Sequence, residues 1–364
     1  ALNVGSRVRP RAMLSAFREI GYEVDVVWGW AAERQQEVGA IKQKIAQGMS
    51  YDFLYSESST MPTLLTEKHH LPTHPWLDYG LFHLCHRANI PLGLYYRDVH
   101  WRFDFARPDV ASLKSLVARF FYHLDLLAYR RWIDVLFLPH HRMLDYVPLW
   151  PRWKKVQALP PGGQLVELPF LPVEDDLQLL YVGGVVPPVY NVASLLQGVA
   201  EAIARGVRVR LTICCPQEQW VRRPREYDQW LGHWVTVVHT GGEELKGYYQ
   251  THHIAMIYWD SSAYLNITLP IKLFEAIGFG RPVVVVNGTA AADIVATEGC
   301  GWIVNSDPDD LGALLYRLST QPDEIERATA RTRAASERHT WAVRAEQVAT
   351  VLCHMHHDRG SKGQ

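Results

Sequence analysis

The stretch LLYVGGVVPPVYNVASLLQGVAEAIARGVRVRLTIC, residues 179–214, decides the fold class. It opens with an apolar run at 179–182, passes through glycines and prolines into helical periodicity over 192–205, and closes with a second apolar run at 207–214. Short runs rich in Val, Ile and Leu that alternate with amphipathic helices predict parallel strands joined by helices. This stretch is therefore expected to be one strand–helix–strand unit of an α/β protein.

The same alternation extends in both directions along the chain. Toward the N-terminus it predicts helices at 11–19, 34–47, 76–88 and 110–132, and strands at 22–28, 51–55, 91–96 and 134–138. Toward the C-terminus it predicts strands at 235–239, 254–258, 282–286 and 301–304, and a last helix at 341–356. Pro/Gly-rich segments at 159–163 and 168–172 interrupt the pattern, which indicates a linker.

Two Rossmann-like domains facing each other across a cleft are therefore expected. The first covers residues 1–165 and the second covers 166–338. Residues 339–364 are expected to form a helix that packs back toward the first domain, followed by a flexible tail.

Charge and composition narrow the function. The 364 residues contain 37 Lys and Arg against 38 Asp and Glu, a net charge of −1, which argues against a dedicated nucleic-acid binder. The total combines +5 over residues 1–165 (20 − 15) with −6 over residues 166–364 (17 − 23). No apolar run approaches the roughly 20 residues of a membrane span, and no signal peptide is visible. Five cysteines, an odd number, suit a reducing compartment, so we expect a cytoplasmic protein.

The most informative motif is YLNITLPIKLFEAIGFGRPVV, residues 264–284. A polar loop leads to Pro270 near a helix start, Lys272 and Glu275 fall in the first turns, and Gly-Arg-Pro leads directly into an apolar strand. Ligands in open α/β sheets bind beyond the carboxyl ends of the strands, where such loops lie. The motif is thus a candidate binding site.

This segment resembles the donor-binding signature of GT-B glycosyltransferases. The similarity is to the large retaining family whose motif reads Glu, seven residues, Glu, then Ala-x-x-x-Gly-x-Pro-Val-Val. The resemblance implies that the Glu275 carboxylate accepts hydrogen bonds from the ribose of a nucleotide-sugar, and that Pro270 is the motif proline. The first motif Glu would fall at Ile267 and is absent. Asn266, or the backbone amides of Thr268 and Leu269, are expected to contact the donor sugar instead.

Further donor contacts follow from the same resemblance. Gly183 and Gly184 follow a strand where the family often carries a phosphate-binding cation. Lys272 is therefore assigned to the diphosphate, which it would stabilise as it leaves. His239, Thr240 and Gly241 follow the strand at which such enzymes hold the base. These residues also have explanations that involve no ligand. Lys272 and Glu275 would then be solvated charges in the first turn of a helix, and the glycines would form ordinary tight turns.

The first domain offers two loops. Gly5, Ser6 and Arg7 lie in a segment, 3–7, that resembles the glycine loop facing the donor phosphates, and whether a strand precedes it stays open. Arg97, Asp98 and His100 follow the strand at 91–96, with Glu57 a secondary candidate after its own strand.

Asp98 is the best-placed general base for an inverting transfer. In a retaining transfer Asp98 and His100 would position acceptor or sugar. The alternative is that Asp98 caps a helix or pairs with Arg97.

No metal and no cofactor are expected. Asp307-Pro308-Asp309-Asp310 resembles the Asp-x-Asp metal motif of the other major glycosyltransferase fold, but its place before an apolar helix predicts a cap. The histidine pairs at 69–70, 140–141 and 252–253 lack a closed four-ligand spacing and are expected at the surface.

The helix predicted at 110–132 carries an apolar stripe with flanking Arg residues. Such a stripe suits the protein core, or an anionic lipid surface at the inner face of a membrane.

The sequence thus predicts a glycosyltransferase that moves a sugar from a nucleotide-diphosphate donor, with a UDP-sugar expected, to a saccharide or lipid-linked acceptor in polysaccharide or glycoconjugate synthesis. A UDP-sugar epimerase of the same fold and a noncatalytic two-domain binding protein are the alternatives. The sugar, the acceptor, the stereochemistry and the oligomeric state stay open.

Overall fold

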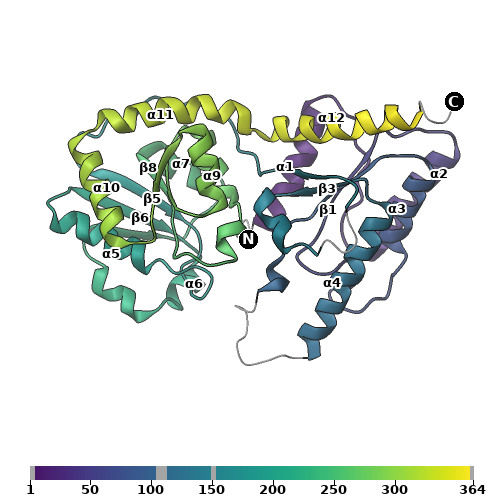
Figure 1. The fold of residues 1–364 in the computed structure, drawn as a ribbon, viewed down its shortest axis with the longest axis horizontal. Coiled ribbons are helices and arrows are strands. Elements are labelled where there is room, and N and C mark those ends of the chain that lie inside the picture. Colours follow the sequence, from purple (N-terminus) through teal and green to yellow (C-terminus); the bar gives the residue numbers. More distant parts are fainter. Residues whose placement is uncertain (1–4, 104–112, 149–152, 361–364) are drawn as a thin grey trace. The chain divides into compact units, whose positions relative to one another are not determined.

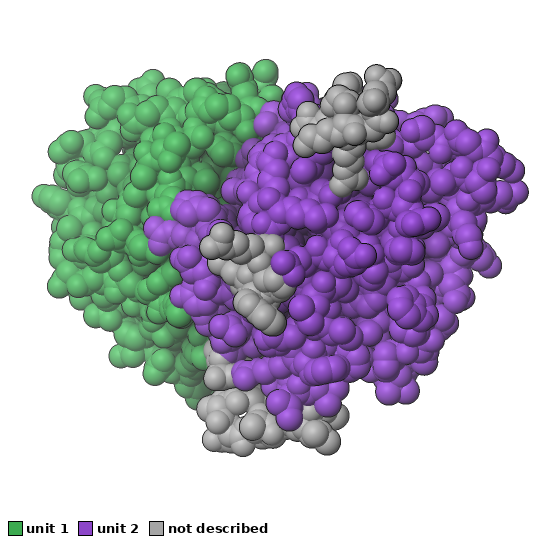
Figure 2. All heavy atoms as spheres, turned by 45° about the vertical axis from the view of Figure 1, so that its right-hand side comes forward, with its two compact units in different colours: residues 1–5, 161–341 green, residues 6–160, 342–364 purple. Residues whose placement is uncertain are grey.

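The computed structural model describes residues 5–103, 113–148 and 153–360, and it contains two compact units. Unit 1 comprises residues 1–5 and 161–341, and unit 2 comprises residues 6–160 and 342–364 (Figure 2). The chain therefore crosses from unit 2 into unit 1 between Pro160 and Pro161, inside the Pro/Gly segment predicted as the linker. It returns to unit 2 after Trp341.

Unit 2 holds a four-stranded parallel sheet of order β1-β2-β3-β4 (Figure 1). Its strands are β1 (Leu54–Glu57), β2 (Leu92–Tyr95), β3 (Val135–Leu138) and β4 (Val156–Ala158). Its helices are α1 (Gly5–Glu19), α2 (Ala31–Ala46), α3 (Leu77–Arg87), α4 (Leu113–Trp132) and α12 (Trp341–Gly360), with single turns η1 (Thr63–Leu65), η2 (His100–Arg102) and η4 (His141–Tyr146). Leu352 of α12 is buried against Gly93 of β2, so the C-terminal helix is part of this unit's core.

Unit 1 holds a six-stranded parallel sheet of order β10-β9-β8-β5-β6-β7. Its strands are β5 (Leu177–Val182), β6 (Val209–Cys214), β7 (Val235–Val238), β8 (Ile254–Ile257), β9 (Val283–Val286) and β10 (Gly301–Val304). Its helices are α5 (Ala193–Ala204), α6 (Gln217–Val221), α7 (Glu243–Thr251), α8 (Ile271–Gly278), α9 (Ala290–Glu298), α10 (Pro308–Thr320) and α11 (Asp323–Ser336), with turns η5 (Arg225–Trp230), η6 (Leu265–Ile267) and η7 (Glu337–His339). The strand order reverses between β5 and β8, which is where open α/β sheets bind ligands.

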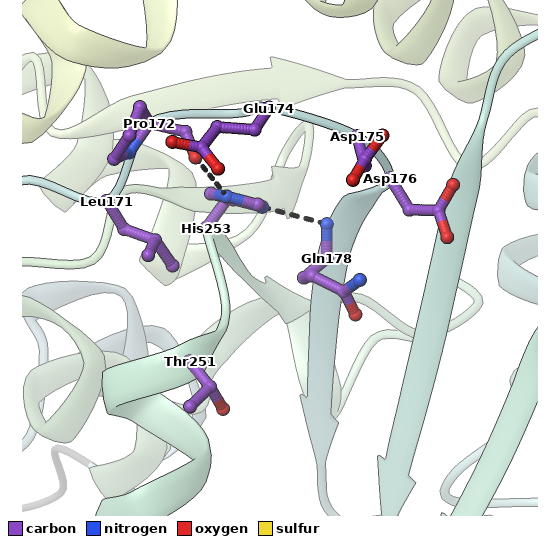
Figure 3. Close-up of a pocket in the computed structure, with 8 residues that line it drawn as sticks. All are labelled: Leu171, Pro172, Glu174, Asp175, Asp176, Gln178, Thr251 and His253. Atoms are coloured by element: carbon purple, nitrogen blue, oxygen red, sulfur yellow. Dashed lines mark hydrogen bonds between the residues drawn. The ribbon is translucent and has the colours of Figure 1, made fainter.

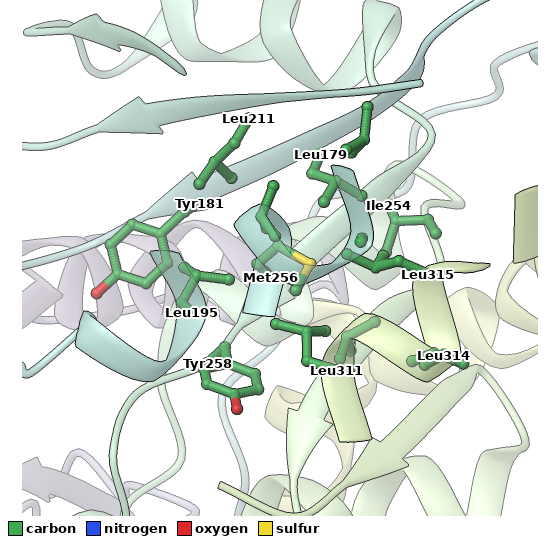
Figure 4. Close-up of a cluster of buried hydrophobic side chains, with 14 of the residues drawn as sticks. Leu179, Tyr181, Leu195, Leu211, Ile254, Met256, Tyr258, Leu311, Leu314 and Leu315 are labelled. Atoms are coloured by element: carbon green, nitrogen blue, oxygen red, sulfur yellow. The ribbon is translucent and has the colours of Figure 1, made fainter. Parts of the chain in front are cut away.

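Helices cover both faces of the unit 1 sheet. Leu179, Tyr181 and Met256 pack on one face against α5 and α10 (Figure 4). Leu180, Ala255 and Val283 pack on the other face against α7, α8 and α9. Because both faces are buried, the strands consist of nearly continuous apolar residues, which is why their runs were recognisable in the sequence.

The chain that enters unit 1 is anchored by its backbone to α8 and to the segment after α11. The Gly163 amide donates to the His339 carbonyl (2.7 Å), and the Val166 amide donates to the Gly278 carbonyl (2.9 Å). A side chain at Gly163 would place its Cβ 2.1 Å from the Phe274 carbonyl oxygen. Close backbone approach therefore requires glycine here.

The α/β fold with two parallel-sheet domains is confirmed, with two local corrections. Residues 22–28, predicted as a strand, form none, although their polar and apolar residues alternate. The Trp28 amide donates to the Glu37 carboxylate (2.6 Å), a side-chain bond in place of a ladder bond. The three-residue strand β4 was missed because it is too short to show a period.

The apolar stripe on α4 divides between core and solvent. Tyr122, Leu126 and Tyr129 are buried, whereas Leu116, Phe120 and Leu127 are among its exposed residues. Among the residues that the structure describes, no helix has both the length and the apolarity that crossing a membrane requires.

Candidate functional site

The candidate site of unit 1 lies at the carboxyl edge of its sheet. Gly183 and Gly184 directly follow β5, and His239, Thr240 and Gly241 follow β7. Parallel pairing of β5 with β6, and of β6 with β7, places these loops at one edge. Both loops therefore lie at the edge at which open α/β sheets generally bind ligands.

Cys214 and Cys215, at the end of β6, join the two loops. The Gly183 amide donates to the Cys214 carbonyl (3.1 Å), and His239 Nδ1 lies 2.9 Å from the Cys215 carbonyl oxygen. The Cys214 thiol donates to the Thr240 carbonyl (3.2 Å). Sequence reasoning missed this role of the two cysteines, which are free thiols, because it used the cysteines only to infer a reducing compartment.

Helix α8 carries the two charged residues of the motif. Pro270 stands at the N-cap, so Lys272 is the second residue of the helix and Glu275 lies one turn further on. The Lys272 ammonium and the Glu275 carboxylate form an ion pair of 2.6 Å, with side chains 31% and 24% exposed. Neither is therefore a fully solvated first-turn charge, and each neutralises the other.

The charges of α8 face the end of β6. Burial raises the pKa of the Cys214 thiol, and Lys272 and Glu275 act on it with opposite signs. Burial, followed by the nearby Glu275 carboxylate, raises the pKa of the buried Tyr249 hydroxyl well above its ordinary value. The Cys214 thiol is therefore hydrogen-bonded to the Thr240 carbonyl and lies within the electrostatic influence of Lys272 and Glu275.

The loop before α8 is held by its own side chains. Asn266 Oδ1 accepts a hydrogen bond from the Ser261 hydroxyl (3.0 Å). The Thr268 amide donates to the Leu265 carbonyl (3.3 Å), and the Leu269 side chain is buried. The Thr268 amide, one of the groups expected to replace the missing motif glutamate, is thus already engaged.

Gly184 is required by packing. A Cβ at this position would lie 2.3 Å from the Tyr190 ring and 2.8 Å from Gln219 Oε1. The Tyr181 hydroxyl donates to the Gly184 carbonyl (2.5 Å), and this hydrogen bond fixes the turn. A tight packed turn is therefore sufficient to explain this glycine. At the β7 loop, Gly242 has a positive φ of 62°, whereas a Cβ on Gly241 would meet nothing within 4 Å.

A pocket lies at the opposite edge of the unit 1 sheet (Figure 3). Its lining includes Asp176, just before β5, and His253, just before β8. The Asp176 carboxylate accepts hydrogen bonds from Arg208 (3.1 Å) and Arg210 (2.7 Å). His253 Nδ1 accepts from the Gln178 amide (2.9 Å), and its Nε2 lies 3.1 Å from the Pro172 carbonyl oxygen. These contacts hold the amino edge of the sheet together, away from the candidate site.

The surface position predicted for the histidine pairs is wrong for His140, His252 and His253, which are buried. Each ring finds hydrogen-bond partners inside the fold; His252, for example, bonds to the Thr212 hydroxyl (2.8 Å). Burial lowers the pKa of His252 and of His253, which favours neutral rings. The predicted cap at Asp307 is confirmed, because its carboxylate accepts from the Asp309 amide (2.9 Å).

In unit 2, Arg97, Asp98 and His100 follow β2 at the carboxyl edge of that sheet. Arg97 does not pair with Asp98. Its guanidinium donates to Glu57 (3.0 Å), at the end of the neighbouring strand β1. Glu57 also accepts from Arg9 (3.2 Å), which is buried and stacks 3.6 Å from the centre of the Tyr95 ring. No sequence signal marks Arg9, which lies 48 residues before Glu57 in the chain.

Asp98 caps a turn, as one of the alternatives held. Its Oδ1 accepts the His100 amide (2.9 Å) at the start of η2, and its Oδ2 lies 3.5 Å from His100 Nδ1. The opposite ring nitrogen, His100 Nε2, lies 3.4 Å from the Tyr122 hydroxyl. The structure therefore brings a carboxylate and an imidazole together at the carboxyl edge of this sheet.

The loop predicted at 3–7 differs in the structure. Helix α1 begins at Gly5, so the backbone of Gly5, Ser6 and Arg7 is helical. The side chains of these three residues, and residues 3 and 4, lie outside the described residues.

Comparison with known proteins defines the class. Residues 176–321 match the family model described as "Glycosyl transferases group 1". No curated protein sequence matches the chain.

Solved structures share the fold of the whole chain. A sucrose-phosphate synthase from Thermosynechococcus elongatus is 16% identical, with a TM-score of 0.56 over 94% of this chain and 91% of that one. Anabaena Alr3699/HepE, in complex with UDP and glucose, is 14% identical, with a TM-score of 0.58 over 91% and 85%. An α,α-trehalose 6-phosphate synthase from Burkholderia multivorans is 13% identical, with a TM-score of 0.55 over 98% and 83%.

The fold is that of the GT-B glycosyltransferases, as the resemblance of residues 264–284 predicted. With residues 176–321 matching the group 1 glycosyltransferases, the chain is a glycosyltransferase and hence a transferase enzyme.

Substituting Gly184 tests whether packing or contact with a ligand requires glycine at this position. We expect Gly184→Ala to lower the free energy of unfolding by about 1–3 kcal/mol, because the new Cβ clashes with the Tyr190 ring. The double variant Gly184→Ala/Tyr190→Ala should recover part of this loss in urea denaturation. Unchanged stability of the single variant, combined with weaker nucleotide binding, would instead show that the glycine serves a ligand.

Proposed function

We propose that this glycosyltransferase moves a sugar from a UDP-sugar to a saccharide or lipid-linked acceptor, in the synthesis of a polysaccharide or glycoconjugate. The observation that carries the proposal is the Lys272–Glu275 pair, which faces the end of β6 at the ligand-binding edge of the domain that matches group 1 glycosyltransferases. The complex of the similar Anabaena HepE structure with UDP and glucose supports the choice of donor.

The ion pair of α8 supplies one group for the diphosphate and one group for the ribose of the nucleotide. Lys272, at the positive N-terminal end of the helix, would bind diphosphate oxygens, and Glu275 would accept hydrogen bonds from the ribose hydroxyls. Both charges are now neutralised by each other at 2.6 Å. Donor binding would therefore exchange the ion pair for a contact of Lys272 with the anionic diphosphate and for hydrogen bonds from the ribose hydroxyls to Glu275.

Backbone groups would complete the donor site. Gly183, Gly184, His239, Thr240 and Gly241 lie on the loops that follow β5 and β7, and would contact the phosphates and the base. The loop at 266–270 (Asn266, Thr268, Leu269, Pro270) would lie toward the sugar.

Asp98 is proposed as the general base, with Arg97 and His100 as acceptor-side groups. The bond between the sugar C1 and the diphosphate oxygen breaks, and UDP leaves with the bonding electrons, stabilised by Lys272. The acceptor oxygen bonds to C1 and gives its proton to the Asp98 carboxylate. The proposed reaction uses no cofactor and no metal. The N-terminal segment with Gly5, Ser6 and Arg7 is proposed to lie near the donor phosphates.

We also propose peripheral contact with the inner, cytoplasmic face of a membrane through α4. Leu116, Phe120, His123 and Leu127 recur at helical spacing on its exposed face. Arg119, Arg130 and Arg131 are exposed beside them, and no acidic residue is exposed in the described part of this helix, because Asp125 is buried. An apolar face flanked only by cations suits anionic lipid.

The donor assignment predicts a loss of UDP binding. Glu275→Ala and Lys272→Ala should each weaken UDP binding about tenfold or more, because each removes a charge-assisted hydrogen bond. The measurement is the rise in melting temperature with UDP. Glu243→Ala and Lys246→Ala remove an equivalent i,i+3 pair (2.8 Å) on α7 and should leave UDP binding unchanged. Full UDP affinity in Glu275→Ala would overturn the assignment.

The base assignment predicts a loss of turnover alone. Asp98→Asn should reduce UDP release in the presence of acceptor by about 10²–10⁴-fold, because the amide cannot take a proton. Asparagine still caps the turn at His100, so folding and UDP binding should be preserved. Asp25→Asn, which removes an exposed carboxylate paired with Lys44, is the control. Turnover unchanged in Asp98→Asn would exclude a base role and favour a positioning role.

The membrane proposal predicts weaker vesicle binding on charge insertion. Leu116→Glu/Phe120→Glu should reduce co-sedimentation with phosphatidylglycerol vesicles about tenfold or more, because the apolar contact is lost and like charges repel. Val221→Glu, an equally exposed apolar site in unit 1, should sediment as the parent does. Parent protein that fails to bind these vesicles would contradict the proposal.

A further inference from the structure

Three tryptophans of unit 2 are unusually exposed. Trp28, Trp30 and Trp76 are 41%, 45% and 75% exposed. Most large aromatic side chains are placed largely inside a protein, and exposed groups of them commonly mark binding surfaces. We call these three residues the tryptophan surface.

The first two rings are held on a built turn. The Trp28 amide donates to the Glu37 carboxylate (2.6 Å), and the Trp30 amide donates to the Glu33 carboxylate (2.7 Å). Gly29 between them has a φ of 97°, a conformation that favours glycine. Two carboxylates of α2 and a left-handed glycine therefore hold the backbone of both tryptophans, whose side chains stay exposed.

The third ring belongs to the same region. Arg34, one turn into α2 from Trp30, donates to Asp78 (2.6 Å), which lies two residues after Trp76 in the first turn of α3. Arg34 also pairs with Glu67 (3.2 Å), next to Lys68, whose ammonium lies 5.1 Å from the centre of the Trp30 ring. Arg34 thus ties the N-terminal ends of α2 and α3 together, with a tryptophan at each.

The charged residues around the tryptophan surface differ from those of α4. Around the tryptophan surface four carboxylates (Glu33, Glu37, Glu67, Asp78) face two cations (Arg34, Lys68). Such a surface repels anionic lipid and nucleic acid. A carboxylate has about four lone-pair sites and can still accept hydrogen bonds from hydroxyl groups. Apolar rings together with hydrogen-bond acceptors suit the C–H faces and the hydroxyls of a neutral sugar.

The position of Trp76 in unit 2 agrees with a role in binding the acceptor. Trp76 lies on the connection from the carboxyl end of β1 to α3, and Asp98 follows the carboxyl end of β2. The two strands are parallel, with Glu57 paired to Tyr95, so both connections start from the same edge of the sheet. Trp76, at the N-cap of α3, and the proposed general base therefore belong to connections that leave the same edge of the unit 2 sheet.

We propose that Trp28, Trp30 and Trp76 bind the outer units of a neutral oligosaccharide acceptor by stacking on their rings. The proposal rests on the proposed function and narrows its acceptor: a saccharide of several uncharged units, in which the reacting end and the stacked units are different residues of one chain.

The test is binding of the full chain to an array of neutral and uronic-acid-containing glycans, with monosaccharides and phosphatidylglycerol vesicles as further probes. We expect the parent to retain neutral glycans of several units more strongly than their monosaccharides. Trp30→Ala and Trp76→Ala should each lower that retention about tenfold, as truncation of a stacked anchor does. Trp76→Phe should retain part of it. Tyr316→Ala, an exposed ring on α10, is the matched control and should bind as the parent does.

Each other outcome overturns the proposal. Retention of no neutral glycan, equal retention by the tryptophan variants, retention of acidic glycans alone, or loss of vesicle binding in the tryptophan variants would each do so. The melting-temperature rise with UDP is measured on every variant. A normal rise with no glycan bound would reject the tryptophan surface while the donor assignment stands. No rise in the parent would reject the proposed function itself.

Discussion

The pairing of β5 with β6 on one side and β8 on the other is the constraint on which unit 1 depends. β5 lies at the centre of the sheet: the chain continues from it to β6 and β7 on one side, and then crosses to β8, β9 and β10 on the other side. The connections after β5, β6 and β7 therefore meet at one edge, where the Gly183 amide donates to the Cys214 carbonyl and the His239 ring contacts the Cys215 carbonyl. Helix α8 then adds Lys272 and Glu275 to this edge. Hydrogen bonding between parallel strands, more than any side-chain contact, assembles the candidate site.

Most of the fold could be predicted from the sequence, because strands covered on both faces are continuous apolar runs. Val283–Val286 is the simplest case, with four valines in succession, all buried. The two wrong predictions concern segments that are not continuous buried apolar runs. Residues 22–28 alternate as a half-buried strand does, but a strand also needs a partner, and a pattern within one segment contains no information about partners. Strand β4 pairs with β3 through three residues only, too few to show any period.

The site was predictable where it depends on local spacing. Lys272 and Glu275 are three residues apart on a helix, so their contact follows from helix geometry. Contacts between distant segments were not predictable. The Tyr190 ring that requires Gly184 and the Arg9 guanidinium that bonds to Glu57 depend on how separate elements pack. The burial of His252 and His253 was misjudged for the same reason: Thr212, which bonds to His252, lies on β6, and Gln178, which bonds to His253, lies on β5.

The anchoring of residues 163–166 has a consequence for building chimaeric enzymes. This segment follows the crossing between the units, yet it bonds to Gly278 at the end of α8, and a side chain at Gly163 would collide with Phe274 within that helix. An exchange of residues 6–160 of unit 2 between relatives should therefore place its junction at Pro160 or earlier. A junction placed after Val166 would pair a foreign linker with the native α8, and this helix would lose the backbone segment against which it packs.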